Sequence, residues 1–272
     1  MKDRMKKYCR ILSVAGSDSG GGAGIQADIK TISACGCYAE TAVTAVTVQN
    51  TLGVSAIHPL PPDIVSAQIL AVYEDIGADA VKTGMFYSAE TVAGAADALR
   101  RCGAGKLVVD PVMVSTSGSV LLEKDALESL IKNLFPLAVL ITPNITEASA
   151  ILGREIKRQD ELDDAAREIS AMSGSAVLVK AGHIDSSEIT DVMYDPSSGF
   201  SYFKSARVDT QNTHGTGCVL SSAIASYLGK GKSLGESVAL AKKYIDGALR
   251  AGSAYKLGQG HGPLHHFYKF WE

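Results

Sequence analysis

Short runs of apolar, mostly β-branched residues alternate with segments of helix length along most of this sequence. The runs are mostly apolar rather than strictly alternating with polar residues, as strands that are covered on both faces should be. They lie at Arg10–Ala15, Thr41–Val48, Ala78–Thr83, Lys106–Asp110, Ala138–Thr142 and Ala176–Ala181. This alternation predicts an α/β fold, in which a mostly parallel sheet lies between two layers of helices.

The segments between these runs carry apolar residues at helical spacing. In the segment 63–75, four apolar residues share one face of a helix, and we expect that face to be buried. They are Ile64, Ala67, Ala71 and Val72. Further helices are expected at Ser88–Arg101, Lys124–Leu134, Ile145–Leu152 and Glu161–Ser173.

The pattern changes in the last third of the chain. Val192–Tyr194 and Phe200–Phe203 flank the turn-forming residues Asp195–Gly199, which predicts a β-hairpin. Two long helical stretches, Gly215–Gly229 and Ser233–Ala254, follow without a strand between them. We therefore expect antiparallel additions to the sheet in the C-terminal half.

Composition excludes several classes of protein. A hydrophobic content of 46% argues against disorder, and a net charge of -3 argues against a nucleic-acid partner. No apolar run approaches the roughly 20 residues that span a bilayer, so no membrane partner is expected. The five cysteines form no C-x-x-C pair, which fits a reduced cytoplasm. No linker or repeat divides the chain, so we expect a leader at 1–9 and one domain at 10–272.

The predicted strands end in glycine-rich or polar segments. Ligands of parallel α/β sheets bind beyond the carboxyl ends of the strands, so six such endings together predict the rim of a pocket. These endings are 16–24, 48–50, 82–85, 110–112, 142–144 and 180–182. The first loop has neither the G-K-[ST] ending of a P-loop nor the G-x-G-x-x-G spacing of a dinucleotide site, so a dehydrogenase is disfavoured.

A second glycine-rich segment, Gly215-Thr216-Gly217-Cys218, leads directly into an apolar helical run. Backbone N–H groups at such a helix start bind anions and suit the charge of a phosphoryl group in transfer. The same positive field is expected to lower the pKa of Cys218 toward the thiolate. The structural alternative is a tight turn followed by a small buried cysteine.

Asn144, Glu147 and Lys180 each fit two interpretations. Asn144 and Glu147 have the spacing of a capping box for the helix at 145–152, and the same oxygens suit a Mg²⁺ held by nucleotide phosphates. Lys180, at the end of an apolar strand, either supplies a positive charge to a phosphate or extends into solvent.

Several segments match one family when they are taken together. The longest are Ala15–Asp28, Ile141–Ala148 and Asn212–Cys218, and the shorter ones are Lys82–Met85, Lys180–His183 and Gly260–Phe267. With these motifs in order from about Ile11 to the C-terminus, the chain resembles the hydroxymethylpyrimidine/phosphomethylpyrimidine kinases. The resemblance implies the three-layer α/β/α sandwich of the ribokinase-like superfamily.

The resemblance also implies an activity. Kinases of this family use ATP and Mg²⁺ to phosphorylate 4-amino-5-hydroxymethyl-2-methylpyrimidine, and then its monophosphate, in thiamine biosynthesis. Such kinases commonly form homodimers. A pyridoxal (vitamin B6) kinase is the alternative enzyme, because the same fold phosphorylates a similar hydroxymethyl heteroaromatic ring. A ligand-binding protein that has lost the chemistry is the non-enzymatic alternative.

Roles for individual residues follow from the resemblance. The substrate-binding residues it implies are Gly16, Asp28, Gln49 and Met85. Those for ATP are Asp110, Lys180, Thr213 and Lys242, and those for Mg²⁺, reached through water, are Asn144 and Glu147. The catalytic group is Gly215, Thr216, Gly217 and Cys218.

Cys218 stands where sugar and nucleoside kinases of the superfamily carry an aspartate. We expect its thiolate to accept the proton of the substrate hydroxyl, which requires a pKa near the working pH. His214, just before it, is expected to be part of the loop scaffold. Residues 115–118 are expected to form a flap that closes over the substrate.

Overall fold

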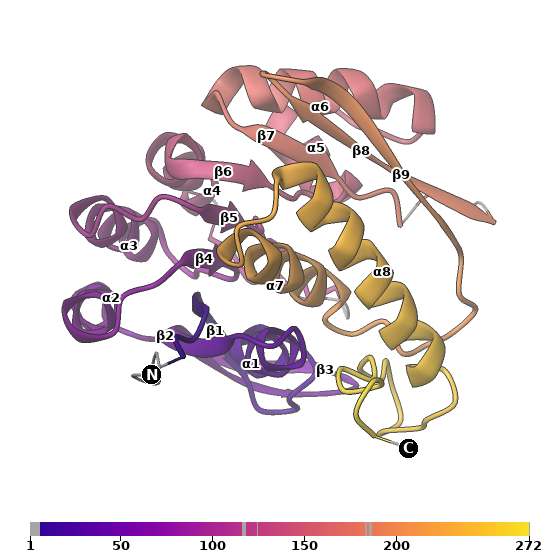
Figure 1. Cartoon of the computed structure of the whole chain (residues 1–272), viewed down its shortest axis with the longest axis horizontal. Coiled ribbons are helices and arrows are strands. Elements are labelled where there is room, and N and C mark those ends of the chain that lie inside the picture. Colours follow the sequence, from indigo (N-terminus) through magenta and orange to yellow (C-terminus); the bar gives the residue numbers. More distant parts are fainter. Residues whose placement is uncertain (1–5, 116–117, 124, 183, 185–186, 272) are drawn as a thin grey trace, which may run out of the picture.

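A single sheet runs through the computed structural model, which describes residues 6–115, 118–123, 125–182, 184 and 187–271 (Figure 1). Its order over these residues is β3-β2-β1-β4-β5-β6-β7-β8-β9. The strands are β1 (Arg10–Asp18), β2 (Tyr38–Asn50), β3 (Gly53–Pro59), β4 (Ala80–Thr83), β5 (Leu107–Val109), β6 (Ala138–Ile141), β7 (Ala176–Val179), β8 (Glu188–Asp195) and β9 (Gly199–Ala206). The central strands are parallel, and β3, β8 and β9 pair antiparallel with their neighbours.

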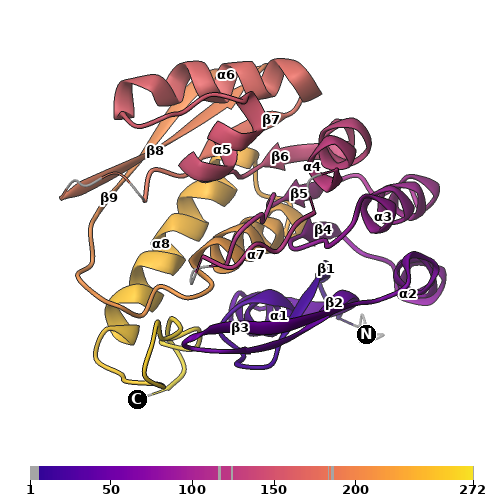
Figure 2. The ribbon, with the colours of Figure 1, turned by 180° about the vertical axis from the view of Figure 1, so that it is seen from behind.

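Helices cover both faces of the sheet (Figures 1 and 2). They are α1 (Gly24–Ala34), α2 (Pro62–Asp75), α3 (Ala89–Arg101), α4 (Ala126–Ser129), α5 (Ile145–Leu152), α6 (Leu162–Ser173), α7 (Thr216–Gly229) and α8 (Leu234–Gly252). A π-helical turn at Leu130–Leu134 continues α4, and short 3₁₀ turns lie at Phe135–Leu137 and Gln159–Glu161. None of the helices in the described ranges is long and apolar enough to cross a bilayer.

Each face of the sheet has its own apolar core. Leu12 and Val14 of β1 pack with Leu99 of α3 on the face covered by α2 to α6. Ile11, which points to the other face, packs with Ile224 of α7. Because successive residues of β1 are buried on opposite faces, the strand is mostly apolar. The predicted three-layer α/β/α sandwich is confirmed.

The six predicted strands and the C-terminal hairpin are all present, with ends shifted by up to four residues. The helix predicted at 124–134 corresponds to α4 and its π-helical continuation, although Lys124 lies outside the described residues. One strand, β3, was not predicted. It pairs antiparallel with β2, so the antiparallel additions lie at both ends of the sheet and not only in the C-terminal half. As an edge strand with mostly exposed or half-buried residues, β3 lacks the continuous apolar run that marks the central strands.

The buried face predicted for α2 is wrong for three of its four residues, since only Val72 packs against the core. Ile64 is 48% exposed, and Ala67 and Ala71 also face outward, whereas Val65 and Ile69 are completely buried. Val65 and Ile69 form a competing stripe at i and i+4. Larger side chains bury more apolar surface than the two alanines, so the stripe that contains them faces the sheet.

The C-terminal segment ties two distant loops together. The N–H of His261 donates to the carbonyl of Thr51, in the turn between β2 and β3, at 3.0 Å. The N–H of His214, just before α7, donates to the carbonyl of Gly262, also at 3.0 Å. Consecutive residues of this strap, residues 258–263, therefore join the β2–β3 turn to the start of α7.

The carboxylate of Glu40 in β2 is buried away from solvent. It is 5% exposed, and neither carboxylate oxygen has a hydrogen-bond partner among the described residues. Burial raises the pKa of Glu40 to about 7, which the charge of Arg10 opposes only in part. Because the folded-state pKa lies above the ordinary value of 4.5, this group favours folding at low pH and loses that contribution as the pH rises through 7.

Replacing Glu40 by glutamine removes this pH dependence. We expect Glu40→Gln to raise the free energy of unfolding by about 1–3 kcal/mol at pH 8 and to leave it nearly unchanged at pH 4.5, measured by urea titration. Glu128→Gln, at an exposed position, is the matched control and should change neither value. An equal effect of Glu40→Gln at both pH values would contradict the assignment.

Candidate active site

One cleft lies along the carboxyl ends of the parallel strands, and all six predicted strand endings line it. Each ending contributes at least one residue. These are Gly16 in the last part of β1, Gln49 at the end of β2, Met85 after β4, Asp110 after β5, Asn144 after β6 and Lys180 after β7. The start of α7 forms another part of the wall, through Gly215, Thr216, Gly217 and Cys218. The predicted pocket rim is therefore confirmed.

The two glycine-rich loops, far apart in the sequence, touch each other in this cleft. Gly215 has a φ of +83°, and a Cβ atom on it would lie 2.0 Å from the carbonyl oxygen of Gly22. Gly22 in turn leaves room for the imidazole of His214, because a Cβ there would lie 2.3 Å from its Cδ2. These glycines let one backbone approach the other, which a side chain would prevent.

Asp18 and His214 connect the same two loops, and this pair was not predicted. The Asp18 carboxylate accepts hydrogen bonds from the N–H groups of Gly20, Gly22 and Ala23, and lies 2.9 Å from His214 Nε2. Burial alone would raise the pKa of Asp18, but the bonds from His214 and the backbone hold it below its ordinary range. The available sequence signal was an aspartate between an apolar strand and a run of glycines. The structure agrees with the expectation that His214 belongs to the loop scaffold.

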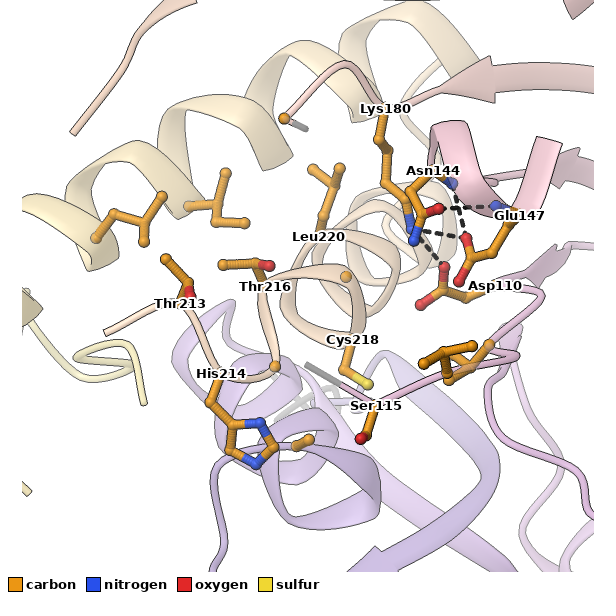
Figure 3. Close-up of a pocket in the computed structure, with 18 of the residues that line it drawn as sticks. Asp110, Ser115, Asn144, Glu147, Lys180, Thr213, His214, Thr216, Cys218 and Leu220 are labelled. Atoms are coloured by element: carbon orange, nitrogen blue, oxygen red, sulfur yellow. Dashed lines mark hydrogen bonds and ion pairs between the residues drawn. The ribbon is translucent and has the colours of Figure 1, made fainter. Parts of the chain in front are cut away.

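A buried charge network lies at the ends of β5, β6 and β7 (Figure 3). Lys180 Nζ lies 2.8 Å from Asp110 Oδ1 and 3.8 Å from Glu147 Oε2. Burial alone would raise the pKa of Asp110, but the charges of Lys180 and Lys82 lower it. Burial, together with the neighbouring Asp110, raises the pKa of Glu147 to about 7. Two carboxylates thus lie around the ammonium group of Lys180, and both line the cleft.

Asn144 and Glu147 also form the predicted capping box. The Asn144 side chain accepts from the Glu147 N–H at 2.9 Å, and the Glu147 carboxylate accepts from the Asn144 N–H at 2.7 Å. Both residues nevertheless line the cleft, so the structural and the ligand-binding interpretations are compatible. Their oxygen donors fit Mg²⁺. Within the described residues no group of three or more His, Cys, Asp or Glu forms a metal cage, so an ion here needs additional ligands from nucleotide or water.

Cys218 lies in the first turn of α7 and points into the cleft near Ser115 (Figure 3). The expected lowering of its pKa is wrong. Burial raises the pKa of the thiol to about 11, because it outweighs the favourable charge of Lys82 and the hydrogen bond from the Gly24 N–H. The field of the helix start is insufficient when the sulfur is surrounded by protein and by the negative charges of Asp28 and Asp110.

Asp28, predicted to contact substrate, does not line the cleft. Its side chain is completely buried, and its carboxylate accepts from Lys82 Nζ at 2.8 Å, Ser13 Oγ at 2.6 Å and Ser222 Oγ at 2.7 Å. The expectation of direct substrate contact is therefore corrected. Asp28 and Lys82 lie in the layer beneath the cleft floor.

The remaining predicted residues lie along the cleft wall. Thr213 and Lys242 line the cleft, and Lys242 Nζ forms an ion pair with Asp191 at 2.8 Å. Of the predicted flap, Ser115 lines the cleft, while Thr116 and Ser117 lie outside the described residues. His183 of the predicted motif at 180–183 also lies outside them.

The sequence of this chain is similar to those of known proteins. The family model for phosphomethylpyrimidine kinase matches residues 18–265. A hydroxymethylpyrimidine/phosphomethylpyrimidine kinase of Rhizobium meliloti is 49% identical over 262 residues, which cover 96% of this chain and 98% of that protein.

Solved structures show the same similarity. The crystal structure of phosphomethylpyrimidine kinase from Clostridium difficile is 44% identical and has a TM-score of 0.78, covering 88% of this chain and 99% of that one. An ADP complex of Bacillus subtilis pyridoxal kinase is 34% identical with a TM-score of 0.88, covering 96% of this chain and 98% of that one.

The contact between the glycine loops gives a direct test. Gly215→Ala places a Cβ against the Gly22 carbonyl in a backbone conformation that alanine avoids, so we expect the Tm to fall by roughly 5–10 °C. ATP binding, followed by calorimetry, should weaken with it. Gly235→Ala is the control, since a Cβ there meets open space. An unchanged Tm for Gly215→Ala, or an equal fall in both variants, would refute the role of this contact.

Proposed function

The chain belongs to the phosphomethylpyrimidine kinase family, and we propose that it catalyses both phosphoryl transfers for which its relatives are named. In the first, the terminal phosphoryl group of ATP passes to the hydroxymethyl oxygen of 4-amino-5-hydroxymethyl-2-methylpyrimidine. In the second, it passes to the phosphate of the resulting monophosphate. The observation that carries this proposal is that the helix start at Gly215–Cys218 and the buried charges around Lys180 face one cleft.

The proposed roles follow the order of residues along this cleft. Gly16, Gln49 and Met85 line the part in which the pyrimidine binds. The N–H groups at the start of α7 are free of partners within the helix and stabilise the negative charge of the phosphoryl group in transfer. Lys180 and Lys242 stabilise the phosphates of ATP, and Thr213 and Asp110 lie beside them.

Magnesium is proposed as the second cofactor. Asn144 and Glu147 would hold it, directly or through water, and the ion would neutralise charge on the nucleotide phosphates when bound. The positive charge of the ion would lower the raised pKa of Glu147 and so favour the ionised carboxylate that binds it.

Cys218 is proposed to accept the proton of the substrate hydroxyl. Because burial raises its pKa to about 11, little thiolate is present at pH 7 and the fraction grows about tenfold per pH unit. A base of this kind predicts that kcat/KM rises with pH between 7 and 9 instead of reaching a plateau.

Two variants test the role of Cys218. We expect Cys218→Ala to lower kcat about 100-fold with little change in KM for ATP, since the loss of a general base removes transition-state stabilisation. Cys218→Asp should restore part of kcat and flatten the pH profile, since a carboxylate is already ionised. Steady-state rates between pH 6 and 9 measure both effects. If Cys218→Ala retains most of kcat, Cys218 is not the base.

A pyridoxal kinase is the second candidate, supported by the fold shared with the Bacillus subtilis enzyme. The higher sequence identity to pyrimidine kinases, 49% and 44% against 34%, favours the pyrimidine alcohol.

An ADP-release assay decides between the candidates. With ATP and Mg²⁺, we expect kcat/KM for the hydroxymethylpyrimidine to exceed that for pyridoxal at least about tenfold, because specificity is a difference in transition-state binding. The monophosphate should also be a substrate. A preference for pyridoxal would establish the alternative, and no turnover with any of the three would favour a binding protein. Omission of Mg²⁺ is the control for metal dependence.

We also propose a homodimer in the cytoplasm. Large apolar side chains are exposed around a shallow surface pocket lined by Val48, Leu52 and Ser119. Val48 is 58% exposed, Leu52 67%, and Val120, next to Ser119, 72%. Such a group of exposed apolar residues is typical of a subunit contact. The five cysteines are all free thiols, which fits a reducing compartment.

A further inference from the structure

The ammonium group of Lys242 is held by two side chains of the hairpin formed by β8 and β9. Lys242 Nζ donates to Asp191 Oδ2 in β8 at 2.8 Å and to Ser205 Oγ in β9 at 3.2 Å. Ser205 pairs with Ile189, so its side chain lies on the same face of the hairpin as that of Asp191, two residues further along β8. The two acceptors therefore meet Lys242 of α8 from one face of the sheet.

Asp191 is itself fixed by the chain that follows β7. Its Oδ1 accepts from the N–H of Ala181 at 2.8 Å, whereas its Oδ2 accepts from Lys242. The paired residues of β7 and β8 end at Val179, and the Asp191 side chain supplies the acceptor for Ala181 beyond that point. Ala181 directly follows Lys180, the other lysine proposed to stabilise the phosphates of ATP. One carboxylate thus connects the backbone beside Lys180 with the ammonium group of Lys242.

The ion pair between Asp191 and Lys242 is buried. The side chain of Asp191 is 4% exposed and that of Lys242 is 12% exposed. Leaving one charge unpaired at such a depth is strongly unfavourable, so we expect the two side chains to stay together. A lysine side chain has many rotamers, and this pair restricts them before any ligand binds. The position of the ammonium group is therefore set by the protein.

The ammonium group of Lys242 retains one hydrogen for a ligand. A lysine ammonium group has three hydrogens and no lone pair. Two of these hydrogens are used by Asp191 and Ser205, and all three residues line the cleft. The third hydrogen is therefore available to an acceptor in the cleft. A phosphate oxygen suits it, because hydrogen bonds between a cation and an anion are the stronger ones.

We infer that Asp191 is a positioning residue for nucleotide binding, which holds Lys242 in place for a phosphate oxygen of ATP and stays paired with it in the complex. The inference rests on the proposed function, since the role of Lys242 is assigned there. The hairpin of β8 and β9 then has a part in the nucleotide site. Asparagine cannot replace Asp191, because its single oxygen cannot accept from both the Ala181 N–H and the Lys242 ammonium group.

Nucleotide affinities test this role without any phosphoryl transfer. The measurement is the Kd, by calorimetry with Mg²⁺ present, for adenosine and for AMP-PCP, an ATP analogue that does not transfer its phosphoryl group. In Asp191→Asn and Lys242→Gln we expect AMP-PCP to bind about tenfold more weakly, and the Kd for adenosine, which has no phosphates, to change less than about twofold. Asp195→Asn, in the same strand but not lining the cleft, is the control and should change neither value.

A double variant shows whether Asp191 acts through Lys242. The protein with both Asp191→Asn and Lys242→Gln should bind AMP-PCP about as weakly as Lys242→Gln alone, since the group that Asp191 positions is already absent. A further tenfold loss would overturn the inference. Equal weakening of AMP-PCP and adenosine would indicate a merely structural role, and tighter binding of AMP-PCP to Asp191→Asn would show that Asp191 competes with phosphate for Lys242. Either of these results also overturns the inference.

The wild-type protein provides a test that does not depend on the folding of a variant. In a crystal structure of its AMP-PCP complex, we expect Lys242 Nζ within hydrogen-bonding distance of both Asp191 Oδ2 and a phosphate oxygen. The absence of either contact would overturn the inference. A wild-type protein that binds AMP-PCP but phosphorylates no pyrimidine would refute the proposed function alone, and the role of Asp191 would still be decided by these measurements. A wild-type protein that does not bind AMP-PCP would refute both.

Discussion

A buried ion pair beneath the cleft holds together the elements from which the cleft is built. Lys82 of β4 and Asp28 of α1 are both completely shielded from solvent, and Asp28 also bonds to Ser13 of β1 and Ser222 of α7. Separating two such charges without water is strongly unfavourable, so arrangements in which these four elements move apart are disfavoured. The position of α7 relative to β1 follows from this pair, and with it the contact between the two glycine loops.

Most of the fold could be predicted because the residue pattern of each central strand indicates that the strand is buried. A strand covered on two faces is apolar at most positions, and this pattern can be recognised without knowledge of the neighbouring strands. Features that depend on which of several apolar surfaces packs on the sheet could not be predicted in this way. In α2, two apolar stripes overlap, and only packing on the sheet selects Val65 and Ile69 over Ile64. The edge strand β3 is half-exposed and resembles a loop in its composition.

The location of the site was predictable, but its electrostatics were not. Polar strand endings indicate where ligands bind, and all six of them line the cleft. The charge state of a side chain depends on what surrounds it in three dimensions. Asp28 is held by Lys82 below the cleft, and the burial of Cys218 outweighs the field of its helix. Asp18 and His214 lie far apart in the sequence, and no local sequence pattern indicates that two such residues form a pair in the fold.

The strap at residues 258–263 has a consequence for how the protein matures. The turn after β2 and the loop before α7 are joined through His261 and Gly262, close to the C-terminus. The strap contacts Thr51 from a position 208 residues further along the chain, and contacts of such long sequence separation carry a loop-closure cost that must be met before they stabilise the fold. The sheet therefore assembles first, and the cleft acquires its final shape only when the strap docks.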